Sequence, residues 1–169
     1  MGDTSAQKMQ VWLSGCNLSE WIENLVQDAE AKGMLEAMQK ERVEQGHSLI
    51  ARNAPELWDA LTSRIEQDVK DLAKSFPDMA IRFERDLADK IVVTNSSTEK
   101  AFTAQCIPEQ EAIKLTFREK LLGLEGVETG QDQINLVTSP SGETVMMWDG
   151  FSGPEKISEH LLKRLIPEP

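Results

Sequence analysis

Two histidines and two cysteines are the first side chains in this sequence to consider for nucleophilic or acid–base chemistry. Cys16 and Cys106 are far apart in the chain, form no CxxC pair, and have no histidine at the spacing of a zinc site. His47 stands in a polar stretch with no Ser, Cys or Asp at a local spacing that would make it a base. The pattern therefore predicts two buried, unreactive cysteines in a reducing compartment, no metal ligand set and no disulfide.

His160 has a more informative position, at the edge of the apolar stripe of a predicted C-terminal helix. A catalytic role would require a partner supplied by the fold, such as Cys106 or Asp149. The run 146–154 sets methionine and aromatic side chains where the last strand meets that helix, and a groove could open there. Trp148, Asp149 and His160 are thus the candidate ligand-binding residues. The alternative is a core strand end followed by a tight turn at 149–150.

Acidic and glycine residues gather between residues 119 and 132, which we expect to form a long loop. The acidic members of interest are Glu125, Glu128 and Asp132, and the glycines are Gly123, Gly126 and Gly130. Their spacing matches neither an EF-hand nor the glycine patterns GxGxxG and GxxxxGK[ST] that cradle phosphates. We therefore expect no metal, no nucleotide and no other cofactor in this loop.

The overall charge excludes further classes of function. The chain has 18 Lys and Arg against 29 Asp and Glu, a net charge of −11, and no basic run that could form a patch for nucleic acid or an anionic membrane surface. No stretch reaches the roughly 18 apolar residues of a membrane span. The Leu13–Cys16 tetrapeptide resembles a lipoprotein cleavage box, but no apolar signal region precedes it. We expect a cytoplasmic protein.

The elements that position these residues begin with two helical segments. Apolar residues recur at spacings of three and four from Leu18 to Ala29, and the pattern thins from Glu30 onward, with a break expected at Gly33 or Gly46. A small apolar spot remains within this polar half, at Met34, Leu35 and Met38. Such a helix projects into solvent, pairs with a second copy or awaits a partner, so this spot is the candidate protein-interaction surface. The alternative is a solvated helix end.

The second helical segment is predicted from Pro55 to Phe76, where Pro77 ends it. Its apolar stripe comprises Leu57, Trp58, Leu61, Ile65, Val69, Leu72 and Phe76. Seven apolar side chains on one side of a helix must be buried against another element.

After Pro77 the apolar period changes from about 3.6 to 2, which indicates half-buried strands. About six are expected, at 79–84, 91–94, 102–106, 113–117, 134–138 and 144–148, and a capping box at Ser152 starts a helix that ends before Pro167. The connections are too short for parallel crossovers, so an antiparallel meander is predicted. The predicted fold class is α+β, with helices covering one sheet face. Residues 1–76 form a helical segment and 77–169 the sheet with its C-terminal helix, within one domain.

Because no catalytic constellation is visible, the sequence favours a non-enzymatic cytoplasmic protein-binding or adaptor module that acts through its helical segment or its sheet face. Its expected partner is another protein or a second copy in a homodimer. The alternative is a small-molecule-binding protein or enzyme with a cleft between the sheet and the C-terminal helix.

Overall fold

The structure is a computed structural model that describes residues 18–120 and 126–167, with side chains described from residue 24 onward. The chain divides into two compact units, residues 1–44 and 45–169, which we describe separately. The Leu13–Cys16 tetrapeptide lies outside the described residues.

A single helix, α2 (Leu18–Ser75), replaces the two helical segments that were predicted. Gly33 and Gly46 each cost a helix about 1 kcal/mol relative to alanine, which is too little to end a long one. Pro55 lies inside the helix rather than at its start. Ile50, Ala54 and Trp58 recur every four residues on both sides of this proline, and all three are buried in one core cluster. Burial on both sides therefore holds the helix through Pro55.

The sheet of the second unit has seven antiparallel strands in sequential order, so the predicted meander is confirmed and the strand number is corrected. The strands are β1 (Ile81–Leu87), β2 (Lys90–Asn95), β3 (Lys100–Ile107), β4 (Ala112–Glu119), β5 (Val127–Thr138), β6 (Thr144–Trp148) and β7 (Phe151–Ser152). A short 3-10 helix, η1 (Pro108–Gln110), joins β3 to β4. The additional strand is β7, whose two residues pair with β6.

The loop predicted over 119–132 is wrong for much of its length, because β5 starts at Val127. Its first residues pair with the end of β4, Glu119 opposite Val127 and Arg118 opposite Glu128. These β5 residues are exposed on both faces, so no apolar alternation marks them as a strand. Backbone pairing with β4 forms the strand instead.

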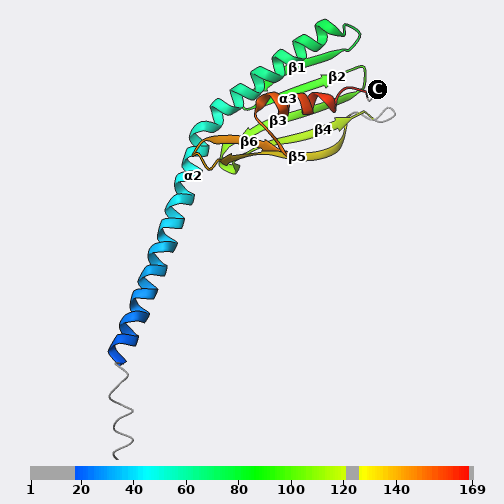
Figure 1. Ribbon diagram of the computed structural model, residues 1–169. Coiled ribbons are helices and arrows are strands. Elements are labelled where there is room, and N and C mark those ends of the chain that lie inside the picture. The colour runs from blue at the N-terminus through cyan, green and yellow to red at the C-terminus, as the bar shows by residue number, and fades with distance from the viewer. Residues whose placement is uncertain (1–17, 121–125, 168–169) are drawn as a thin grey trace, which may run out of the picture. The chain divides into compact units, whose positions relative to one another are not determined.

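One face of the sheet carries the core. Alternate residues of the strands point to this face, and they pack with buried residues from α2 and from α3 (Pro154–Lys163), which lies over the sheet (Figure 1). Leu61 and Ile65 of α2 are completely buried there. The α+β class is confirmed.

Two details at the ends of the helices differ from prediction. Phe76 was assigned to the apolar stripe but is 55% exposed, since α2 ends at Ser75. The predicted capping box at Ser152 is wrong, because the residue that caps α3 is Gly153, which makes no side-chain cap and has φ of 82°. Glycine tolerates this left-handed conformation, and Pro154 then starts the helix.

Candidate functional site

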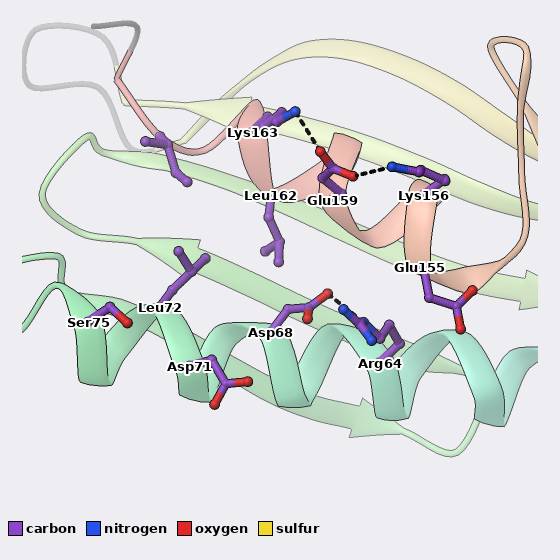
Figure 2. A pocket seen from close by; sticks show the side chains of 11 residues that line it. Arg64, Asp68, Asp71, Leu72, Ser75, Glu155, Lys156, Glu159, Leu162 and Lys163 are labelled. Atoms are coloured by element: carbon purple, nitrogen blue, oxygen red, sulfur yellow. Dashed lines mark hydrogen bonds and ion pairs between the residues drawn. The ribbon is translucent and has the colours of Figure 1, made fainter.

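An interhelical groove with a volume of about 530 Å³ lies between α2 and α3 in the second unit. Leu72 of α2 and Leu162 of α3 point toward each other across it (Figure 2). Ile166 continues this apolar strip beyond the end of α3. The sequence had suggested a cleft between the sheet and the C-terminal helix. This groove lies instead between two helices.

Ion pairs line the groove on both sides. On α2, the Arg64 guanidinium lies 3.0 Å from the Asp68 carboxylate, which also accepts a hydrogen bond of 2.7 Å from Ser158 of α3. On α3, Glu159 accepts hydrogen bonds from Lys163 at 2.7 Å and from Lys156 at 3.1 Å (Figure 2). These two ammonium groups lower the pKa of the Glu159 carboxyl to about 2. The charges on the α3 side are thus mutually compensated.

The three candidate ligand-binding residues, Trp148, Asp149 and His160, lie together in the structure. The His160 ring is 5.3 Å from the Trp148 ring and 4.5 Å from the Phe151 ring, measured between centroids. Its Nε2 atom is 3.8 Å from a carboxylate oxygen of Asp149. A cavity of about 350 Å³ opens beside His160 and Phe151.

The same residues also perform the structural roles given by the alternative interpretation. Trp148 is only 3% exposed, and its indole N–H donates to the Asp132 carboxylate at 2.9 Å. Asp149 and Gly150 have φ of 49° and 80° and form the tight turn between β6 and β7. His160 and Asp149 are therefore the members of this group with polar atoms near solvent.

Cys106, considered above as a partner for His160, is buried on β3. Burial, followed by the nearby carboxylates of Asp89 and Glu109, raises the pKa of its thiol to about 11. At neutral pH Cys106 is a neutral thiol and supplies no thiolate.

The predicted interaction surface belongs to the first unit. We call Met34, Leu35 and Met38 the Met34 patch; their exposed fractions are 71%, 59% and 65%. All side chains from residue 24 to residue 44 are exposed.

Sequence reasoning missed two features of the second unit. The His47 side chain pairs with Glu111, which is 64 residues away in the chain. The Arg164 guanidinium lies over the Phe117 ring at 4.7 Å and over the Trp148 ring at 4.8 Å. Both contacts join segments that are distant in the sequence, so no local spacing could have indicated them.

Within residues 18–120 and 126–167, no cluster of three or more His, Cys, Asp or Glu side chains is placed to hold a metal ion. No helix in this part of the chain is both long and apolar enough to span a membrane. Comparisons with protein-family models, with curated proteins and with solved structures found no match. The fold and the surfaces define an α+β protein with one helix-covered antiparallel sheet, a groove between two helices and an exposed apolar helical patch.

Proposed function

We propose that the protein acts by binding another protein chain through residues 24–44 of α2, and that its first partner is a second copy of itself. The observation that carries this proposal is the exposure of the Met34 patch, in which three large apolar side chains lie on one helix without burial. A methionine-containing apolar patch suits contact with another helix because methionine adapts its shape to the surface that it meets.

The spacing within the patch supports a helix as the partner. Met38 follows Met34 by four residues and Leu35 by three. Side chains at these spacings are neighbours on a helix, so Met34, Leu35 and Met38 form one continuous spot around Met38. Ala31 precedes Met34 by three residues and extends the same side with a small side chain. A small residue beside three large ones lets a second helix approach closely.

The charges around the patch favour an antiparallel second copy. Asp28, Leu35 and Arg42 follow one another at intervals of seven residues and therefore lie along one side of the helix. In an antiparallel pair centred on Leu35, Asp28 of each copy meets Arg42 of the other, which gives two symmetric ion pairs. A parallel pair would place like charges opposite each other instead. Closed twofold pairing of this kind is the commonest symmetry of protein oligomers.

The experiment is sedimentation equilibrium of the full chain and of exposed-site variants. Met38→Glu places a charge inside the patch, and we expect it to weaken association about tenfold or more, since a buried unpaired charge is costly. Val43→Glu is the matched control: it is also exposed, and at 100° per residue it lies about 140° around the helix from Met38.

The charge arrangement has its own test. We expect Arg42→Asp to weaken association, because Asp28 then faces a carboxylate, and we expect the double variant D28R/R42D to restore it. A wild-type chain that stays monomeric, or a Val43→Glu variant that weakens association as much as Met38→Glu, would overturn the proposal. A double variant that restores nothing would overturn the antiparallel arrangement.

Small-molecule binding is a second candidate function, favoured by a cavity of about 350 Å³ that His160 lines and by the contacts of His160 with Trp148 and Asp149. A cavity of this size is within the range of small-ligand sites. The test is an NMR titration of the His160 ring with a panel of metabolites, with His160→Ala as the binding-site variant and His47→Ala as the control. If no metabolite shifts the His160 signals selectively, this candidate function is wrong. The cytoplasmic location stays a prediction under either function.

A further inference from the structure

We propose that the outer edge of β1 pairs with the same edge of a second copy of the chain, so that two sheets join into one. β1 is the first strand of the sheet, and its one strand neighbour within the described residues is β2 (Figure 1). Residues 84–87 are all exposed, so the edge is open to a partner. β1 belongs to the second unit and the Met34 patch to the first, and the inference does not rest on the function proposed above.

The backbone groups that point outward from β1 follow from its register with β2. The carbonyl oxygen of Ala80 accepts a hydrogen bond of 3.0 Å from the N–H of Ser96, which comes directly after β2. Antiparallel strands exchange hydrogen bonds at every second residue, so the even-numbered residues of β1 point toward β2 up to the bulge after Arg85. The backbone N–H and C=O groups of Phe83 and Arg85 therefore point outward. Such unpaired groups are a template for another extended strand.

Side-chain charge determines how two β1 strands would align. With the strands antiparallel and Phe83 opposite Phe83, Arg82 of each copy lies opposite Glu84 of the other. Arg82 and Glu84 are both exposed, and in the part of the chain that the structure describes neither takes part in an ion pair within 4.0 Å. This alignment therefore gives two symmetric ion pairs.

The neighbouring alignments bring like charges together. A shift that centres the pair on Arg82 or on Glu84 places that residue opposite its own copy, and like charges directly opposite each other are destabilising. The alignment centred on Phe83 avoids both contacts.

The same alignment matches free donors with free acceptors. The Phe83 N–H of each copy meets the Phe83 carbonyl oxygen of the other, and the Arg85 N–H meets the carbonyl oxygen of Ile81. The N–H of Ile81 is not needed, since it already donates to the carbonyl oxygen of Met79 at 2.7 Å. On the core side of the sheet the half-buried Phe83 rings of the two copies meet, which removes apolar surface from water.

The experiment is sedimentation equilibrium of the full chain carrying Met38→Glu, which removes any association through the Met34 patch. We expect a dimer. Adding Arg82→Glu should weaken it about tenfold, because both ion pairs become pairs of carboxylates, and the further change Glu84→Arg should restore it to within about twofold. Both residues are exposed, so these changes disturb no core contact.

Lys114→Glu is the matched control. It reverses an exposed positive charge on the same sheet face, but on β4, an inner strand with no free edge. Association of this variant should stay within about twofold of the Met38→Glu chain.

Disulfide cross-linking tests the alignment itself. Residues 82 and 84 of the two copies would form a non-hydrogen-bonded pair with Cα atoms about 4.5 Å apart, within the range of a disulfide. We mix an Arg82→Cys chain with a Glu84→Cys chain, both carrying Cys16→Ser, so that the other cysteine is the buried Cys106. Under mild oxidation the mixture should form a covalent dimer that neither variant forms alone.

Three results would contradict the pairing of β1 edges. A Met38→Glu chain that stays monomeric up to its solubility limit would overturn the proposal, and so would a dimer that Arg82→Glu leaves unchanged. Equal weakening by Lys114→Glu would show a general charge effect and would also overturn it. A Glu84→Cys chain that cross-links by itself would overturn the alignment centred on Phe83. Because every comparison is made in the Met38→Glu chain, failure of the Met34 patch as an interface would leave these results readable.

Discussion

Leu61→Ala is the substitution that tests the architecture most directly. Leu61 is completely buried where α2 packs on the sheet, one turn from Trp58, which is also buried. Truncation removes the transfer free energy of the leucine and leaves a cavity, so we expect the free energy of unfolding to fall by about 2–5 kcal/mol. Since 1.4 kcal/mol is a factor of ten, this lowers the folding equilibrium constant by about thirtyfold or more. The free energy of unfolding is measured by urea denaturation, monitored by tryptophan fluorescence and by circular dichroism.

Leu87→Ala is the matched control, because it makes the same chemical change on β1, where the leucine is 56% exposed. Exposed substitutions usually change stability by about 0.5 kcal/mol or less. If Leu61→Ala lowers the free energy of unfolding no more than Leu87→Ala does, at an unchanged m-value, then α2 does not pack into the core that covers the sheet.

Three further predictions concern single side chains. An NMR titration should give the Glu159 carboxyl a pKa of about 2, and Lys163→Gln should raise this pKa. The ion pairs of Glu159 with Lys156 and Lys163 stabilise the fold above pH 4.5, and this contribution is lost as the pH falls toward 2. In a Cys16→Ser variant, Cys106 should react with a thiol reagent at pH 8 only after unfolding, because its pKa in the fold is about 11. Since this pKa is raised by folding, the free energy of unfolding should fall as the pH rises from 9 to 11. Asn95→Ala should lower the free energy of unfolding by about 1–3 kcal/mol, measured by urea unfolding, since it removes hydrogen bonds to Leu165 and Ser97; a loss near zero would contradict this.

Much of the fold could be predicted because the burial of β2 and β3 alternates along the strand. The buried residues Phe102, Ala104 and Cys106 stand on β3 between half-buried neighbours, and this rhythm alone indicates a strand with one dry face. The short connections then allow only antiparallel pairing. By contrast, β5 begins with exposed residues and has no such rhythm before Ile134, so its first half could not be found in this way.

The helix boundaries were harder because local signals competed with burial. Pro55 and Gly46 both indicate a break, but Ile50 and Trp58 are buried and the helix continues through this stretch. A glycine destabilises a helix by about 1 kcal/mol and a proline by about 3 kcal/mol, whereas the burial of a few large apolar side chains stabilises it by more. Tertiary packing therefore decides the outcome, and it cannot be read from a local pattern.

The candidate sites show why residue types alone are a poor guide to function in this chain. Trp148 was proposed as a ligand contact, yet it is a buried ring whose edge meets His160 and which Arg164 covers. His160 on α3 and Arg164, which caps the end of α3, both lie against the Trp148 ring. One core side chain thus orients two polar ones toward two different cavities. Trp148 is thus part of the core, and the polar groups that reach solvent beside it belong to Asp149, His160 and Arg164.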